Sequence, residues 1–310
     1  MIFSVIILLA VCILMPAYFA WRIMRLNEAT KAGWLILVAD ALVFSALVFL
    51  VGRWDIAGYY TRYVLVAVLA ASVLWSLRKH TSLPWFSYGI RDLWRSHWTS
   101  VFSLVTFSAA LVYVIYGLLP PSNPKHLTFP LADGQFVVGQ GGGISLLNHH
   151  ASHPERRYAV DISAIYQSGF RAHGILPTEL SAYAIYGSSV VSPCTGTVIA
   201  TRDDLPDLIP PQADPENATG NHVVVDCRGF NVELAHLMPG SLLVAPGDRV
   251  TERDTLGKVG NSGNTTEPHL HIHAVDPQTG RGLPMSFDGS APVRNRIYRY
   301  GLQPPPSASN

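Results

Sequence analysis

The chain has 310 residues, of which 49% are hydrophobic and only 14% are charged. Soluble globular proteins carry about 25% charged residues. The composition therefore excludes a disordered chain, an ordinary single soluble domain and a nucleic-acid-binding domain that relies on basic charge. All seven Trp lie before residue 99, whereas ten of the twelve His lie after residue 125. We expect two physically different parts that join near residue 120.

Four long apolar segments fill the first part, and about 20 apolar residues suffice for a helix to cross a bilayer. The segments are Ile2–Trp21, Ala32–Gly52, Tyr63–Leu77 and Thr99–Leu119. We predict an all-α membrane anchor of four transmembrane helices over residues 1–120. No basic residue precedes Ile2, which favours a span over a cleaved signal peptide.

The charges of the short loops predict the orientation of this anchor. Loops on the cytoplasmic side carry an excess of Lys and Arg. The loops after the first and third segments carry seven basic residues, against two (Arg53 and Arg62) after the second segment. The seven are Arg22, Arg25, Lys31, Arg78, Lys79, Arg91 and Arg95. We expect a multi-pass protein of the cytoplasmic (inner) membrane, in contact with membrane lipid, whose second part is extracytoplasmic.

Asp40 lies in the middle third of the second apolar segment. An ionisable group inside a bilayer is costly and is by default a functional candidate. The simpler interpretation is a hydrogen bond that packs two spans together. A transport or sensor protein would need more polar intramembrane residues than Asp40 alone.

After residue 120 the sequence changes to short apolar runs broken by Gly, Pro, Asn and Asp, a pattern typical of strands. We predict a linker over residues 121–135, a mostly antiparallel β domain over 136–303 and a disordered tail over 304–310. The predicted strands are Val190–Val191, Thr197–Ala200, His222–Asp226, Val232–Ala235, Leu242–Val244 and Leu270–Ala274. One short helical turn is expected over Ser163–Phe170, and an exposed insertion over residues 201–221.

Cys194 and Cys227 both fall on predicted strands of this domain. Outside the cytoplasm two such cysteines can form a disulfide. The alternative is a pair of buried thiols, because proximity in space is not visible in a sequence.

Histidines alternate along the segment that contains His269, His271 and His273. Residues two apart in a strand point to the same face, so three imidazoles would share one face. Such a face is hard to explain as core and easy to explain as a metal site, with one ligand and further histidines in supporting roles. A carboxylate, Asp161, and a lone strand histidine, His236, occur in separate upstream blocks.

Residues 145–276 resemble the catalytic domain of the lysostaphin-like (LytM-type) zinc metallopeptidases, here in a membrane-anchored form. The pieces that carry the resemblance are the Asp161 block, Ala235-His236-Leu237, Pro246-Gly247-Asp248-Arg249-Val250, the Gly257–Gly263 turn and Pro268-His269-Leu270-His271. The resemblance implies a compact antiparallel β fold with an open groove. It also implies that Asp161 and His271 bind Zn²⁺ and that His236 and His269 are catalytic.

The first metal ligand departs from the common family pattern. That pattern places a His four residues before the Asp, where this chain has Arg157. His150 closes an Asn-x-His piece that resembles longer-loop variants of the family, and we take it as the ligand. His153 and His149 are the alternatives.

The resemblance implies a zinc metalloendopeptidase, a hydrolase that cleaves peptide cross-links of bacterial peptidoglycan. Its partners are then a cell-wall peptide and membrane lipid, with no nucleic acid; a regulatory membrane partner is left unspecified. The alternative is a catalytically inactive LytM-type module that binds the wall or activates other wall hydrolases. Such a module should lack part of the His and Asp set, whereas Asp161, His236, His269 and His271 are all present.

Overall fold

The computed structural model describes residues 2–87 and 89–301. The chain divides into two compact units, Met1–Tyr116 and Gly117–Asn310. The predicted disordered tail, residues 304–310, lies outside the described residues. Each unit is considered by itself below.

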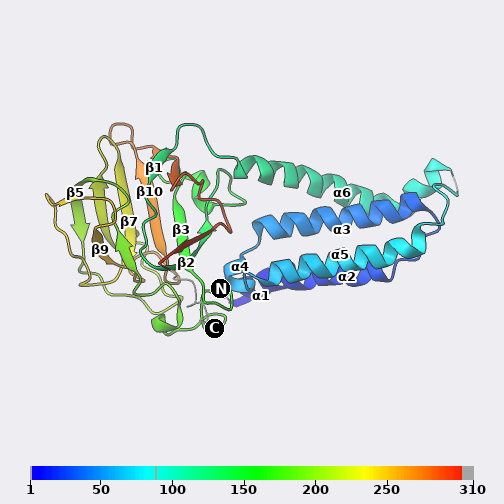
Figure 1. Cartoon of the computed structure of the whole chain (residues 1–310), viewed down its shortest axis with the longest axis horizontal. Coiled ribbons are helices and arrows are strands. Elements are labelled where there is room, and N and C mark those ends of the chain that lie inside the picture. Colours follow the sequence, from blue (N-terminus) through cyan, green and yellow to red (C-terminus); the bar gives the residue numbers. More distant parts are fainter. Residues whose placement is uncertain (1, 88, 302–310) are drawn as a thin grey trace, which may run out of the picture. The chain divides into compact units, whose positions relative to one another are not determined.

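The first unit is helical (Figure 1). Its elements are α1 (Ile2–Leu9), the π-helical η1 (Ala10–Leu14), α2 (Met15–Met24), α3 (Lys31–Val51), α4 (Trp54–Ala57), α5 (Thr61–His80) and α6 (Ile90–Leu118). Four of its helices are long and apolar enough to cross a membrane: Phe3–Met24, Lys31–Val51, Thr61–His80 and Arg91–Leu118. The prediction of four such helices is confirmed, and the third and fourth are longer than their apolar segments indicated.

Polar contacts join the long helices. Ser103 on α6 donates a hydrogen bond of 2.6 Å to Oδ1 of Asp40 on α3. The Trp34 indole on α3 donates to the Ser76 hydroxyl on α5 over 3.0 Å. Side-chain hydrogen bonds of this kind join helices in apolar surroundings. The packing interpretation of Asp40 is thereby confirmed.

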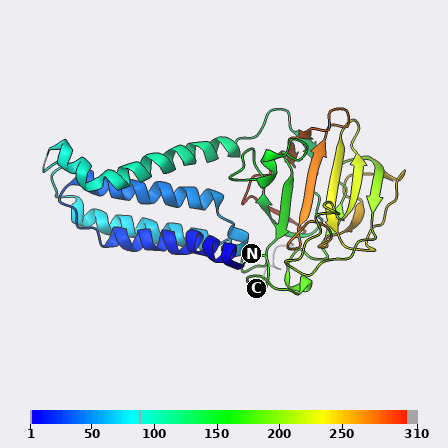
Figure 2. The ribbon, with the colours of Figure 1, turned by 180° about the vertical axis from the view of Figure 1, so that it is seen from behind.

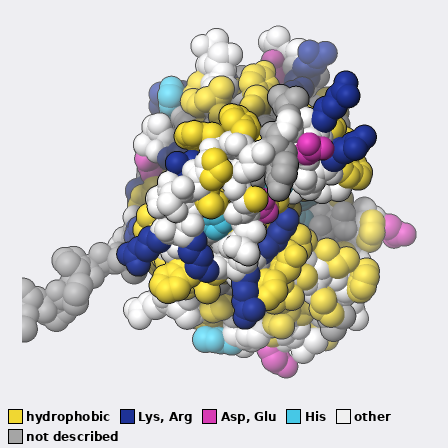
Figure 3. Space-filling model, turned by 90° about the vertical axis from the view of Figure 1, so that its right-hand side faces the viewer, with side chains coloured by type: hydrophobic (Ala, Val, Ile, Leu, Met, Phe, Trp, Pro, Cys, Tyr) yellow, Lys and Arg dark blue, Asp and Glu magenta, His cyan; other side chains and the backbone are white. Residues whose placement is uncertain are grey.

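The loop from α2 to α3 and the loop from α5 to α6 lie at the same end of the helical unit (Figures 1 and 2). Figure 3 looks onto the chain from that side and shows Lys and Arg side chains among hydrophobic ones on the face that it draws. The two loops, with the basic residues in them and in the adjoining helix ends, are therefore together at one end, which is the arrangement that a charge-based orientation needs.

The second unit is a mostly antiparallel β domain. Its strands are β1 (Lys125–Leu127), β2 (Gly134–Gln140), β3 (Val160–Ala164), β4 (Ser189–Val191), β5 (Gly196–Arg202), β6 (Asn221–Asp226), β7 (Asn231–Leu237), β8 (Arg249–Val250), β9 (Thr255–Lys258), β10 (Leu270–Val275), β11 (Gly282–Leu283), β12 (Met285–Phe287) and β13 (Ile297–Tyr300). The main sheet has the order β13-β2-β3-β10-β7-β6-β5-β8, and β11 also pairs with β10. Two small sheets pair β1 with β12 in parallel and β4 with β9 antiparallel.

Two local predictions are wrong. Leu242–Val244 is not a strand, because the Leu242 amide donates to the Asp203 carboxylate instead of joining a ladder, and Leu243 is 69% exposed. Ser163–Phe170 does not form a helical turn. Its first residues belong to β3, and the pairing continues through the Ile165 amide, which donates to the Gln135 carbonyl.

The segment 121–135 is not a free linker. It contains β1, and Phe129 and Leu131 are fully buried in the hydrophobic core. The Phe129 ring stacks on the Tyr298 ring at a centroid distance of 4.4 Å. The β domain therefore begins before residue 136.

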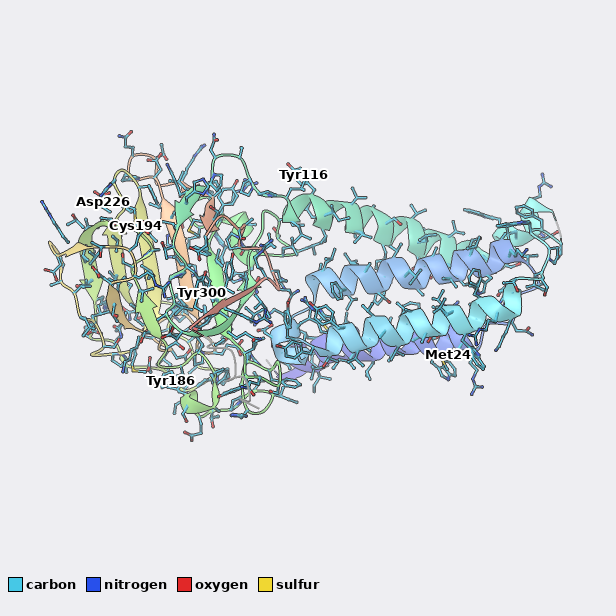
Figure 4. All side chains as sticks on the ribbon, in the orientation of Figure 1. Met24, Tyr116, Tyr186, Cys194, Asp226 and Tyr300 are labelled. Atoms are coloured by element: carbon cyan, nitrogen blue, oxygen red, sulfur yellow. A yellow bond between two sulfur atoms is a disulfide. The ribbon has the colours of Figure 1, made fainter. Side chains whose placement is uncertain are left out.

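Cys194 and Cys227 form a disulfide that ties the segment after β4 to the end of β6. Figure 4 shows Cys194 close to Asp226, the residue that precedes its partner. The disulfide alternative is therefore confirmed.

The expected insertion, residues 201–221, is only partly exposed, with eight of its 21 residues exposed, and it is held at its centre. Its ends belong to β5 and β6. Between them, the Asp207 carboxylate accepts hydrogen bonds from the Tyr186 hydroxyl (2.9 Å) and from the Asn261 amide (2.6 Å). The insertion is thus attached to the glycine-rich turn that precedes the histidine strand.

Candidate metal centre

Three neighbouring strands in the middle of the sheet position the candidate groups (Figure 2). Asp161 on β3 lies directly opposite His271 on β10. On the other side of β10, His271 lies opposite Ala235 of β7, next to His236. The sheet register therefore brings together an Asp and two histidines that are far apart in the sequence.

The Asp161 carboxylate is the centre of the cluster. His150 Nε2 lies 3.1 Å from both of its oxygens, and His271 Nδ1 lies 2.9 Å from Oδ1. His269 Nε2 lies 3.7 Å from the same oxygen. Burial raises the pKa of Asp161, but the surrounding imidazoles, His269 first, outweigh burial and hold that pKa well below its usual value.

A short 3-10 helix, η2 (His149–Ser152), presents His150 to the carboxylate. The Asn148 side chain accepts a hydrogen bond from the His150 amide and donates one to the Ala159 carbonyl at 2.9 Å. It thereby connects the two ends of the loop that runs from His150 to β3. Donor atoms of His149, His150 and Asp161 all lie within 4.8 Å of one another. His153 is exposed and belongs to no such group among the described residues.

His236 occupies a β-bulge. Asn221 pairs with Leu237 and His222 with Ala235, so His236 is the extra residue, and its φ is +65°. A bulge of this kind redirects a side chain next to a site. The His236 ring is buried, with its centroid 4.8 Å from that of His269. Its Nδ1–H donates to the Ser262 carbonyl over 2.9 Å, which leaves Nε2 without a proton in the neutral ring. Burial lowers the pKa of His236 well below its usual value.

His269 lies just before β10, which begins at Leu270 as the predicted strand does. Its Nδ1–H donates to the Glu267 carbonyl over 2.9 Å, and the Thr265 hydroxyl lies 3.1 Å from the same nitrogen. His269 Nε2 is therefore the nitrogen that faces Asp161. The loop before β10, rather than the strand itself, sets this ring's orientation.

Arg171 holds that loop, and sequence reasoning did not single it out. Its guanidinium is buried and donates to the Glu267 carboxylate, through Nε at 3.0 Å and also through Nη2. Nη2 donates as well to the Ile175 carbonyl at 3.4 Å. Arg171 and Glu267 are 96 residues apart, and only the apolar surroundings of Arg171 could have indicated it.

His271 and His273 point to the same side of β10, as the alternation predicted. His271 Nε2 lies 3.2 Å from His273 Nδ1, and both side chains are buried. Burial lowers the pKa of both rings, that of His273 to about 2. Both imidazoles are therefore neutral at physiological pH.

The donor set fits a zinc ion. Two neutral imidazoles and one carboxylate are common ligands of catalytic zinc, which keeps a further position open. In the described part of the chain, the ion-pair partners of Asp161 are histidines only. A low-pKa carboxylate surrounded by imidazoles, with no Lys or Arg to neutralise it, suits a bound cation. His150, Asp161 and His271 are the residues that could hold it.

Fold and site together define an antiparallel β domain with a cluster of histidines around the carboxylate of Asp161. Residues 180–281 match the model of Peptidase family M23. This match identifies residues 180–281 as a peptidase M23 domain. The matched range includes His236, His269 and His271 but not His150 or Asp161.

Several solved structures resemble parts of the chain. A zinc-containing peptidase from Vibrio cholerae is 25% identical, with 33% of this chain and 26% of that chain covered and a TM-score of 0.26. A putative peptidase M23 from Pseudomonas aeruginosa is 20% identical, with coverages of 62% and 59% and a TM-score of 0.29. The catalytic domain of lysostaphin from Staphylococcus simulans is 17% identical, with coverages of 40% and 84% and a TM-score of 0.21.

The chain spans less than two thirds of the first two of these structures. No curated protein matches it. The family match therefore supports a peptidase or an M23-like module.

Proposed function

We propose that the chain is a membrane-anchored, zinc-dependent metalloendopeptidase that hydrolyses peptide cross-links of bacterial peptidoglycan. The observation that carries this proposal is one buried carboxylate, Asp161, in contact with His150 and His271, next to the catalytic candidates His236 and His269. His150, Asp161 and His271 would hold the metal. The substrate class comes from the family resemblance.

A zinc ion bound there would lower the pKa of a water molecule and polarise the scissile carbonyl. The remaining chemistry belongs to His236 and His269. His236 is kept neutral by burial and presents an unprotonated Nε2, so it suits the acceptance of a proton from the attacking water. His269 Nε2 lies 3.7 Å from Asp161 Oδ1, which places this ring beside the proposed metal position and makes it the second group available for proton transfer or oxyanion stabilisation.

The proposed location is the cytoplasmic membrane, with the peptidase domain on the extracytoplasmic side. Seven basic residues, in the two loops at one end of the helices and in the helix ends beside them, support this orientation. The Cys194–Cys227 disulfide agrees with an oxidising compartment. A reporter that is active only in the cytoplasm, fused after Asn310, should give no signal. Strong signal would reverse the orientation.

The activity is tested with the full chain in detergent and cross-linked peptidoglycan fragments. New amino termini, detected by mass spectrometry, should form with the untreated protein, disappear after chelation and return with added Zn²⁺. Binding of the fragments without cleavage under all three conditions would instead favour the inactive LytM-type module.

The first ligand is tested by three single variants, each compared for bound zinc. His150→Ala should lose zinc, because a three-ligand site rarely survives the loss of one ligand. His153→Ala and His149→Ala should retain it and serve as matched controls. Retention in His150→Ala with loss in either control would assign the first ligand to that other histidine.

A further inference from the structure

His273 has no role in the proposed reaction, yet it is the third histidine on the same face of β10. Its side chain is 8% exposed, and its ring centroid lies 5.3 Å from that of His271. A polar ring at such a depth needs hydrogen-bond partners. Its partner is Nε2 of His271, a candidate metal ligand.

The two ring nitrogens of His271 face different groups. Nδ1 lies 2.9 Å from Asp161 Oδ1, and Nε2 lies 3.2 Å from His273 Nδ1. A metal ion shared with Asp161 would bind Nδ1 and take its lone pair. The single proton of the neutral ring would then reside on Nε2, which points at His273.

We propose that His273 is a positioning residue for metal binding: its Nδ1 accepts the Nε2–H of His271 and so fixes the tautomer and the orientation of that ring. The inference rests on the proposed zinc site. Metal-bound histidines generally donate their second N–H to a carboxylate, a carbonyl or water. Here an imidazole occupies the acceptor's place.

The neighbouring strand keeps this acceptor available. Glu233 on β7 lies directly opposite His273. Its Oε1 is 3.9 Å from His273 Nδ1, too far for a hydrogen bond, and within the described part of the chain this buried oxygen has no hydrogen-bond partner. Glu233 therefore does not compete with His271 Nε2 for the hydrogen bond to His273 Nδ1.

Loss of the acceptor leaves the Nε2–H of His271 buried and unpaired whenever Nδ1 binds metal. Mutation of groups that orient metal-bound histidines typically lowers metal affinity about 10- to 100-fold. The loss of the acceptor therefore lowers metal affinity, because the His271 ring in the metal-free protein can adopt its other tautomer.

Three variants of the full chain in detergent separate these effects. His273→Phe keeps the ring size and removes the acceptor. His273→Asn carries an oxygen on Cγ, where histidine carries Nδ1, and restores an acceptor at that place. His126→Phe is the matched control, since His126 is exposed on β1 and its Nδ1 lies 2.8 Å from the Ser286 hydroxyl.

Zinc affinity is measured with Zn²⁺ alone in competition with a chromophoric chelator, and the thermal midpoint of each metal-free variant is recorded beside it. We expect His273→Phe to bind zinc about 10- to 100-fold more weakly than the wild type. His273→Asn and His126→Phe should stay within about threefold of the wild type, since the acceptor is restored or untouched. If His273→Phe does not fold, His273→Gln replaces it, because its oxygen lies one bond further out and misses the Nδ1 position.

Unchanged zinc affinity in His273→Phe, or equal losses in His273→Phe and His273→Asn, would overturn the positioning role while leaving the zinc site intact. A wild-type chain that binds no zinc would overturn the proposed function itself, and the positioning role with it.

Discussion

Arg171 is predicted to hold the loop that orients His269. We consider the substitution Arg171→Met, which keeps a long apolar stem and removes the guanidinium. The side chains of Arg171 and Glu267 are 3% and 16% exposed. Removing one partner of a buried ion pair costs about 3–5 kcal/mol, because the other charge stays buried without compensation. The slight exposure of Glu267 places the expected loss near the lower end, about 3 kcal/mol.

The assay is thermal unfolding of the metal-free full chain in detergent. For a domain of 150–250 residues, 1 kcal/mol shifts the midpoint by about 2–4 °C. Arg171→Met should therefore lower the midpoint of the β domain by roughly 6–12 °C. Adding Glu267→Gln should recover part of that loss, since the carboxylate that lost its guanidinium partner no longer carries a charge.

Arg202 provides the matched control. Its guanidinium pairs with the Asp204 carboxylate at 2.9 Å, but the two side chains are 38% and 74% exposed. Solvent screens exposed pairs, so they contribute little to stability. If Arg171→Met unfolds at the same temperature as Arg202→Met, the Arg171–Glu267 pair does not hold the loop and the reasoning is refuted.

Three further predictions concern the disulfide, the buried histidines and the helical unit. Cys194→Ser opens a loop of 33 residues and should cost roughly 4 kcal/mol, seen as a lower thermal midpoint that reductant does not lower further. Burial lowers the pKa of His236 and His273 in the folded state, so below the unfolded value of 6.5 the unfolded chain binds more protons. The metal-free chain should lose about 1 kcal/mol per such group between pH 6.5 and 5.5, because the unfolded imidazole goes from half to almost fully protonated in this range; a flat denaturation profile would contradict this. Ser103→Ala should lower the midpoint of the helical unit, whereas Thr106→Ala, which loses only a bond to its own helix, should not.

The sequence predicted the features that depend on local pattern. Apolar length alone identifies α3, because its 21 residues contain one acidic side chain. Alternation alone places His271 and His273 on one face of a strand. Both patterns depend on neighbours within a few residues, so no tertiary information is needed to recognise them.

Features set by distant segments were not predictable in this way. β3 brings Asp161 to the site, but its residues are all buried or half-buried, so it shows no alternation of apolar and polar positions. The local sequence places Phe129 in a linker, because its burial depends on contacts with Tyr298 and Phe287, far along the chain. The bulge at His236 arises from the register of β6 against β7, which a single strand's sequence does not encode.

The most direct test of the proposed centre measures zinc content and cross-link cleavage on the same preparations of three chains. The wild-type chain should bind zinc and cleave. Asp161→Ala should lose both, because the carboxylate contacts His150 and His271. His269→Ala should keep zinc and lose about a hundredfold or more in cleavage rate, as expected for a positioned proton-transfer or oxyanion group. Full zinc content in Asp161→Ala, or undiminished cleavage in His269→Ala, would contradict the assignment.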